Sequence, residues 1–236
     1  NTNAFEINAG SDLALLYNDQ SVLENHHCAV SFRIMKNSRC NVLQSLSIHD
    51  AKEARKLMVT CILATDMSMH FQLVADLNNK LDSGDEWQVS SDIEQHFLAK
   101  VILHAADLSN PVRQFHVSAA WAVKIAEEFN EQVPYFRILL ARSIQIHLTL
   151  VCQVKREEEL GLPVLGFMVT TNERTLAKNE INFVSFVVEP MWRSIVRMLP
   201  DVQQCVENLE SNKEHWRLVS EGFEDLEVAH PFRVSE

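Results

Sequence analysis

The chain has 236 residues, 47% of them hydrophobic, which is enough to bury the core of one domain. A formal net charge of −11 argues against nucleic acid or an anionic membrane surface as a partner, and five glycines and six prolines are too few for a turn-rich β protein. Apolar residues recur at three- and four-residue spacing, so the sequence predicts an all-α fold. Five cysteines without metal-type spacing indicate reduced thiols in a cytoplasmic protein.

Capping signals place the first helices. Ser11 opens a short helix that ends near residue 17, and Ser21 with Glu24 fits a capping box at the start of the next helix. The same signature at Asp50 begins a long helix that is expected to reach about residue 77. Further helices are expected over residues 92–107, over 118–132 with an apolar stripe of Trp121, Ile125 and Phe129, from about 175 with a kink at Pro190, and over 201–219.

Two segments contain an acid whose neighbours in sequence indicate a catalytic or metal-binding role. Each segment also has a purely structural interpretation. Glu24 is followed by His26 and His27, but adjacent histidines point about 100° apart, so both are not expected to bind one ion. A capping box and a polar helix face would explain these three residues without any chemistry. Asp66 lies inside the predicted long helix beside apolar residues, which favours a buried acid that hydrogen bonds from Thr65 or from metal-bound water would support.

The segment that ends at Pro111 is the most informative one. His104 and Asp107 are three residues apart and therefore share one helix face. Asp107 follows a run of apolar residues, where a carboxylate is costly unless something such as a metal ion compensates it. A capped helix end with an incidental acid is the alternative. Three carboxylates on three different helices would suit a metal-dependent hydrolase.

Several segments resemble, in order, the signature blocks of the class I cyclic-nucleotide phosphodiesterases. The matching segments are residues 3–5, 17–27, 64–70, 103–111, 121–129, 161–168 and 181–192. The resemblance implies that residues 1–236 form a single, partial catalytic domain, a compact multi-helix bundle that is truncated at the N-terminus. It also implies hydrolysis of cAMP or cGMP to the 5′-monophosphate in signal transduction. In that family, two divalent ions, zinc plus magnesium or manganese, activate the attacking hydroxide.

The resemblance further implies roles for single residues. Asp107 would be a direct zinc ligand, whereas Glu24, Thr65 and Asp66 would order metal-bound water and the ligating histidines. The residues that bind the nucleotide would be Asn110 near the base, Ile125 and Phe183 on its two faces, and Glu180 where the family has a purine-binding glutamine. An ionised glutamate only accepts hydrogen bonds, so the choice between cAMP and cGMP stays open.

Two further features separate this chain from the family. The family's proton-donating histidine and three of its metal ligands would precede Asn3, so we expect the 236 residues by themselves to be inactive. Residues 133–153 form a largely apolar insertion. It is too short for a membrane span and contains charged and polar side chains that a span would not carry. It is either an extra core helix or a retained intron, because its removal joins Gln132 to Val154 in a family-like sequence. The sequence of the transcript decides between these two.

A competing interpretation is a non-catalytic helical module that binds a nucleotide or a partner helix without hydrolysis. Under either interpretation the expected partner is small or proteinaceous, with no nucleic acid and no membrane span in this segment. A homodimer is compatible with both interpretations.

Overall fold

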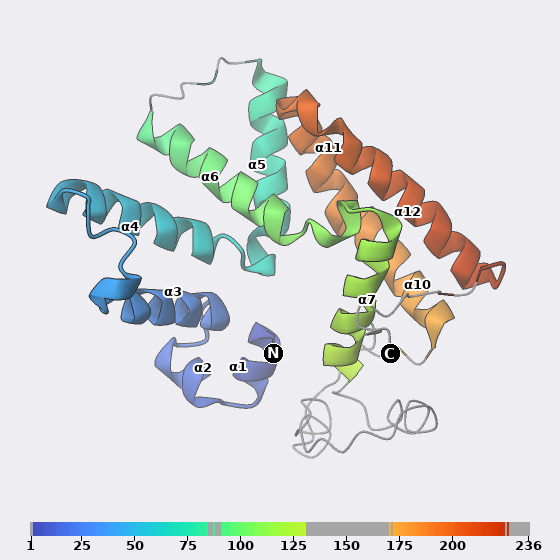
Figure 1. Ribbon diagram of the computed structural model, residues 1–236, viewed down its shortest axis with the longest axis horizontal. Helices are drawn as coiled ribbons and strands as arrows, with labels where there is room; N and C mark the ends of the chain where they lie inside the picture. Colours follow the sequence, from blue (N-terminus) through green and yellow to red (C-terminus); the bar gives the residue numbers. More distant parts are fainter. Residues whose placement is uncertain are drawn as a thin grey trace, which may run out of the picture. The chain divides into compact units, whose positions relative to one another are not determined.

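The computed structural model describes residues 2–84, 87, 91–130, 170, 172–224 and 226. These residues form helices and connecting turns with no strand among them (Figure 1), which confirms the predicted all-α fold. They group into two compact units, residues 1–107 and residues 108–236. The insertion at 133–153 lies outside the described residues, and the assignment of 1–236 to one partial catalytic domain stays a prediction.

The first unit contains every acid that the sequence predicts for the metal side of the site. Its elements are α1 (Asn3–Asn8), α2 (Asp12–Leu16), α3 (Val22–Met35), η1 (Ser38–Cys40), α4 (Ile48–Leu63), η2 (Met67–Met69), α5 (His70–Ser83) and α6 (Asp92–Asp107). α4 packs against both α3 and α6. The side chains of Val22, Leu77 and Val101 are fully buried, so the start of α3 and the middle of α5 and α6 are anchored in the core.

The long helix predicted over residues 50–77 is in fact two helices that meet at 81°. α4 begins after Ser47, whose hydroxyl accepts from the backbone N–H of Asp50 at 3.1 Å and donates to its carboxylate at 2.8 Å. The predicted start at Asp50 is therefore three residues too late. The chain breaks after Leu63 because the carboxylate of Asp66 accepts the backbone N–H of Ser68 and caps a 3-10 turn.

No single helix in the described part of the chain is long and apolar enough to cross a membrane. The bent pair formed by residues 48–63 and 67–83 passes this test together, by length and composition alone.

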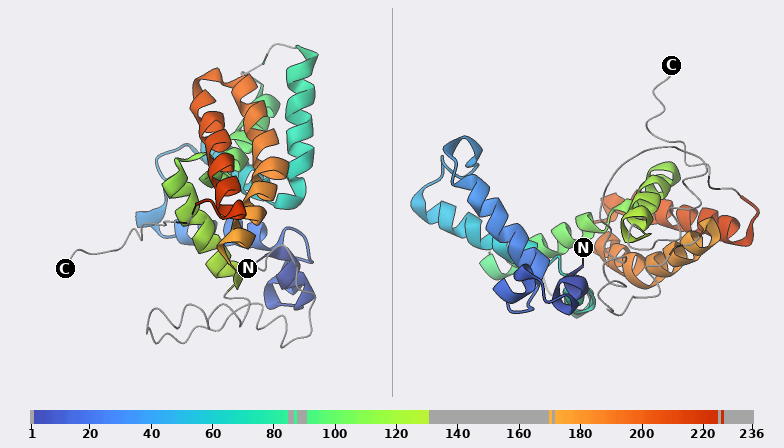
Figure 2. Two further views of the ribbon diagram at one scale, coloured as in Figure 1. Left: turned by 90° about the vertical axis from the view of Figure 1, so that its right-hand side faces the viewer. Right: turned by 90° about the horizontal axis from the view of Figure 1, so that it is seen from below.

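The second unit packs α7 and α10 against α12. Its elements are η3 (Asn110–Val112), α7 (Phe115–Asn130), α10 (Glu173–Phe183), a π-helical segment (Val184–Val188), α11 (Glu189–Met198), η6 (Pro200–Val202) and α12 (Gln203–Glu221). Figure 2 shows α12 running alongside α10 and α11. One buried hydrophobic cluster of this unit consists of Ala119, Ala122, Ala126, Leu176, Ala177, Trp216 and Val219.

The face of α7 that packs into this core differs from the predicted one. The predicted stripe included Trp121 and Ile125, but these side chains are 49% and 36% exposed, and the side chain of Phe129 lies outside the described residues. Three alanines form the buried face instead, because small side chains let α7 lie close to the bulky ring of Trp216.

Pro190 lies where the sequence predicts a kink. It is the second residue of α11 and follows one π-helical turn, Val184–Val188. A proline has no backbone N–H to donate and its ring clashes with the preceding turn, and a π-helical turn accommodates that loss. The long apolar helix therefore consists of two helices joined by this turn.

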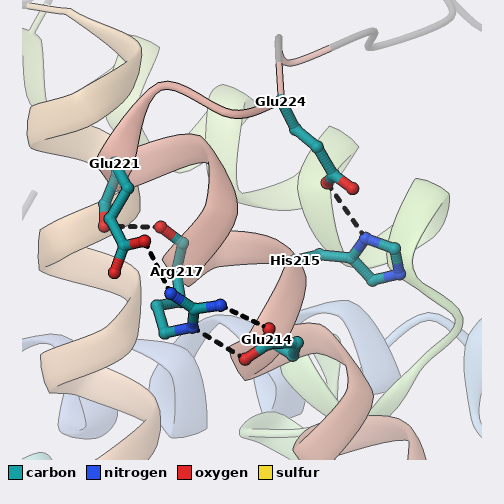
Figure 3. Close-up of polar contacts among 6 residues, drawn as sticks. Glu214, His215, Arg217, Glu221 and Glu224 are labelled. Atoms are coloured by element: carbon teal, nitrogen blue, oxygen red, sulfur yellow. Dashed lines mark hydrogen bonds and ion pairs between the residues drawn. The ribbon is translucent and has the colours of Figure 1, made fainter.

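The exposed side of α12 carries local ion pairs (Figure 3). Arg217 contacts Glu214 at 2.7 Å and Glu221 at 2.6 Å, and His215 contacts Glu224 at 3.2 Å. Ion pairs between solvent-exposed side chains contribute little to stability, because water screens the two charges. We therefore interpret them as support for α12.

Candidate functional site

Glu24 is a buried acid that accepts a hydrogen bond from a residue of another helix. It lies in the first turn of α3 and is 9% exposed. The side-chain amide of Asn3, on α1, donates to Glu24 Oε2 at 2.8 Å. The predicted capping box is wrong at this position, because Ser21 has a left-handed backbone and its side chain makes no capping hydrogen bond to α3. Glu24 is thus a buried carboxylate whose orientation depends on Asn3.

Asp66 is also a buried acid, as the sequence predicts, although it lies between two helices. Ser21 Oγ donates to Asp66 Oδ2 at 2.7 Å, and the backbone N–H of Ser68 donates to Oδ1 at 2.8 Å. Burial raises the pKa of Asp66, but the hydrogen bonds from Ser68 and Ser21 outweigh it and hold the pKa below its ordinary value. Asp66 is therefore ionised at neutral pH.

The support predicted for Asp66 comes from different residues. The hydroxyl of Thr65 donates to the backbone carbonyl of Ile62 at 2.8 Å, so it stabilises the end of α4. The donors that orient the acids come from Ser21, Ser68 and Asn3, and the sequence pattern predicts this role for none of them. Asn3 comes from α1 and Ser21 lies 45 residues before Asp66, so helical spacing carries no signal for either contact.

His104 and Asp107 occupy different environments. The imidazole of His104 is fully buried, and its Nε2 lies 2.9 Å from Nδ1 of His70, another fully buried histidine. Burial lowers the pKa of His104, although a backbone hydrogen bond with Ala64 and the charge of Asp107 act in the opposite direction. Asp107 itself is exposed, so the expected desolvation of this carboxylate is not present.

The described residues do not by themselves fit a bound metal ion. No group of three or more histidine, cysteine, aspartate or glutamate side chains among them is arranged to hold one. A zinc site needs about four ligands, and Asp107 is the only direct ligand that the sequence predicts. His26 faces the ring of Tyr17 edge-on and His27 is exposed.

The residues predicted to bind the nucleotide lie in the second unit. Asn110 begins η3, and α12 holds this turn: Asn212 Nδ2 donates to the carbonyls of Pro111 at 2.8 Å and Arg113 at 2.7 Å. Asn212 is 1% exposed, so these hydrogen bonds are shielded from water. The backbone from Pro111 to Arg113, directly after Asn110, is thereby held against α12.

Two other predicted binding residues share one face of α10. Glu180 and Phe183 are three residues apart on this helix, and Phe183 is 37% exposed. Ile125, on α7, is exposed to a similar degree at 36%. Burial raises the pKa of Glu180 to about 7. A carboxyl group with that pKa is protonated in a large fraction of molecules near neutrality and can then donate a hydrogen bond as well as accept one.

Comparison with known proteins decides the family. The family model described as 3'5'-cyclic nucleotide phosphodiesterase matches residues 1–209. The chain belongs to the 3'5'-cyclic nucleotide phosphodiesterase family. Members of this family use divalent metal ions.

Similar proteins agree with this assignment. The 3',5'-cyclic-AMP phosphodiesterase 4C of Rattus norvegicus is 30% identical over 222 residues, which cover 92% of this chain and 37% of the rat protein. The phosphodiesterase domain of the RhoPDE fusion protein from the choanoflagellate Salpingoeca rosetta is 33% identical, with a TM-score of 0.83 over 94% of this chain and 64% of that domain. LmjPDEB1, solved in complex with IBMX, is 28% identical with a TM-score of 0.77, covering 94% of this chain and 61% of that one. This phosphodiesterase-family chain therefore spans little more than a third of the rat relative.

Proposed function

We propose that the protein to which this chain belongs hydrolyses 3',5'-cyclic nucleotides to 5'-monophosphates in cyclic-nucleotide signalling. The observation that carries the proposal is the family match over residues 1–209. The buried carboxylates of Glu24 and Asp66 support it, because each accepts a hydrogen bond from a fixed donor. Buried acids with fixed hydrogen bonds are suited to ordering water or a ligating histidine.

The proposed roles of the residues divide between the units. In the first unit, Asp107 is a direct ligand of zinc, and Glu24 and Asp66 order the groups around this ion. The second ion of the pair is magnesium or manganese. In the second unit, Asn110, Ile125, Glu180 and Phe183 contact the nucleotide. Because one carboxylate cannot hold zinc at useful affinity, we propose that the 236 residues alone do not hydrolyse the substrate.

The direct test is product analysis with cAMP and cGMP as substrates. The purified 236-residue chain, supplied with zinc and with magnesium or manganese, is expected to form no 5'-monophosphate. The protein translated from the complete transcript is expected to form it with the same metals. Hydrolysis by the 236-residue chain would overturn the first expectation, and an inactive complete protein would overturn the proposed activity.

A second function is favoured by one observation, namely that no group in the described part of the chain is arranged to hold a metal ion. The chain would then be a non-catalytic module that binds a cyclic nucleotide or a partner helix. Calorimetric titration of the 236-residue chain with cAMP and cGMP, in the presence of a chelator, separates the two. Tight binding without metal supports the module, whereas binding that requires metal supports the enzyme.

Two further properties belong to the proposal. We place the protein in the cytoplasm, on the basis of cysteines without disulfide or metal spacing. We also propose a homodimer, which sedimentation equilibrium of the purified chain would test by its mass.

A further inference from the structure

The helix α3 is capped by a residue from a different helix. The residue before the first turn of a helix usually places a side-chain oxygen on the N–H of the second or third helical residue. Ser21 occupies that position but makes no such hydrogen bond. The N–H of Leu23, the second residue of α3, instead donates to Asn3 Oδ1 at 2.9 Å. Asn3 of α1 thus caps α3, the role that the sequence predicts for Ser21.

The hydroxyl of Ser21 is turned towards Asp66 instead. Ser21 Oγ donates to Asp66 Oδ2 at 2.7 Å, across 45 residues of sequence. The turn that delivers it has a strained backbone, since Asn18, Asp19 and Ser21 have φ values of 52°, 60° and 39°. Residues with side chains stay in this region only where surrounding contacts hold them, and such strain clusters at functional sites.

The same amide of Asn3 also orients the other acid. While Oδ1 of Asn3 caps α3, its Nδ2 donates to Glu24 Oε2 at 2.8 Å. A single amide makes both contacts because it presents a donor and an acceptor in one plane, which an ionised carboxylate in its place could not do. Glu24 and Asp66 are 9% and 7% exposed, so their orientation depends on protein donors more than on solvent.

We propose that Asn3 and Ser21 are positioning residues that hold the carboxylates of Glu24 and Asp66 in fixed orientations for cyclic-nucleotide hydrolysis. Asn3 holds Glu24 directly and also caps α3, and Ser21 holds Asp66. The inference rests on the proposed function. The hydrogen bonds that carry it all lie within the first unit.

The two contacts can be measured without activity, from the carboxyl carbons of the 236-residue chain by NMR titration. Asn3→Asp keeps an oxygen for the N–H of Leu23 but places a negative charge beside Glu24, so the pKa of Glu24 should rise by about 1 or more. The same variant should leave the pKa of Asp66 in place. Ser21→Ala should do the reverse, raising the pKa of Asp66 and leaving that of Glu24 in place.

Two variants serve as matched controls in this titration. Asn8→Asp makes the same chemical change at an exposed position of α1 and should move neither pKa. Ser11→Ala removes a serine that caps α2 in the ordinary way, accepting from Ala14 N at 3.1 Å, so it should lower the unfolding temperature without moving either pKa. If Asn3→Asp and Ser21→Ala behave like these controls, the contacts do not position the acids and the inference is overturned.

The functional part of the inference is a split between kcat and KM in the protein translated from the complete transcript. Asn3→Asp and Ser21→Ala should each lower kcat by about 10- to 100-fold, the effect typical of partners that orient a reacting group. KM should change by less than about threefold, because neither side chain is proposed to contact the nucleotide. If the wild type hydrolyses the substrate and both variants keep its kcat, the positioning role alone is overturned. If the wild type is inactive, the proposed function is overturned.

Discussion

The chemistry of Glu180 is set by burial. This acid lies half-buried on α10, and burial raises its pKa to about 7. The family position is predicted to carry a glutamine that binds the purine, and a protonated glutamate is the closest chemical equivalent, with one donor and one acceptor. At this position the protonation state of the side chain would therefore decide which base edge it can pair with.

The raised pKa of Glu180 predicts a pH-dependent stability. In the unfolded chain the carboxyl ionises near 4.5, whereas in the folded chain it stays protonated up to about 7. Its favourable contribution is therefore complete below pH 4.5 and is lost as the pH rises through 7. Glu180→Gln removes the ionisable group and with it the loss of stability at high pH. The variant should therefore be more stable than the wild type by about 1–3 kcal/mol at pH 8 and by much less at pH 5.

Urea unfolding of both proteins at pH 5 and pH 8 measures this difference. Glu207→Gln, the same change on the exposed side of α12, is the control and should show no such pH dependence. Equal stability of wild type and Glu180→Gln at both pH values would contradict the raised pKa.

Part of the residue-scale chemistry could be predicted from the sequence. The apolar neighbours of Asp66 correctly predicted a buried acid, since a solvated helix face would show polar residues in register. The partners of Asp66 and Glu24 could not be predicted, because Ser21 and Asn3 are brought to them by tertiary packing. Asp107 shows the opposite error, since apolar neighbours in sequence did not bury it.

Among the elements of the second unit, α12 and the turn of η3 are joined by three side-chain hydrogen bonds. Asn212 donates to two backbone carbonyls of that turn, and Asn208 donates to the carbonyl of Val112 at 3.0 Å. Asn212→Ala leaves two carbonyls without this donor at a buried position, so it should lower the free energy of unfolding by about 2–4 kcal/mol. Asn208→Ala, which removes one half-buried hydrogen bond, should cost about 1 kcal/mol. Chemical denaturation ranks the two variants, and an equal or reversed order would contradict this account.

α5 and α6 are joined by the buried histidine pair. Burial holds the pKa of His104 below its ordinary value, so the folded chain keeps this imidazole neutral while the unfolded chain takes up a proton near pH 6.5. Stability should therefore fall as the pH is lowered from about 7 towards 5. His104→Gln should flatten this dependence in urea unfolding, while His27→Gln, at an exposed position of α3, should leave it as steep as in the wild type. A dependence that persists in His104→Gln would show that other groups cause it.

Helix boundaries were predictable where local signals act alone. The expected helix at 92–107 matches α6 at both ends, since Asp92 begins it and Ser109-Asn110-Pro111 follows it. The expected helix at 50–77 failed, because helical periodicity continues across the break and only the side chain of Asp66, bonded to Ser68, ends it. An interruption of the helix near Pro190 was predictable, while its form, a π-helical turn over Val184–Val188, was not.

For the whole molecule, the hydrophobic pattern of the sequence predicts the fold, whereas only the resemblance to the phosphodiesterase family predicts the site. Helical periodicity and few glycines were enough for the all-α class. The candidate site required the ordered sequence blocks, because its residues are far apart in sequence and include single carboxylates that spacing cannot interpret. The chain covers 37% of the rat relative, and its described residues contain no group of three or more side chains arranged to hold a metal ion around Asp107.

The central claim is that Asp107 binds metal in an enzyme that hydrolyses cyclic nucleotides. The measurement that tests it most directly is the rate of 5'-monophosphate formation by the protein translated from the complete transcript, wild type against Asp107→Asn, with Asp92→Asn at the other end of α6 as the control. We predict hydrolysis by the wild type and the control, and a rate at least about 100-fold lower for Asp107→Asn, because loss of a charged ligand weakens the metal site. Equal rates for the wild type and Asp107→Asn would contradict the claim.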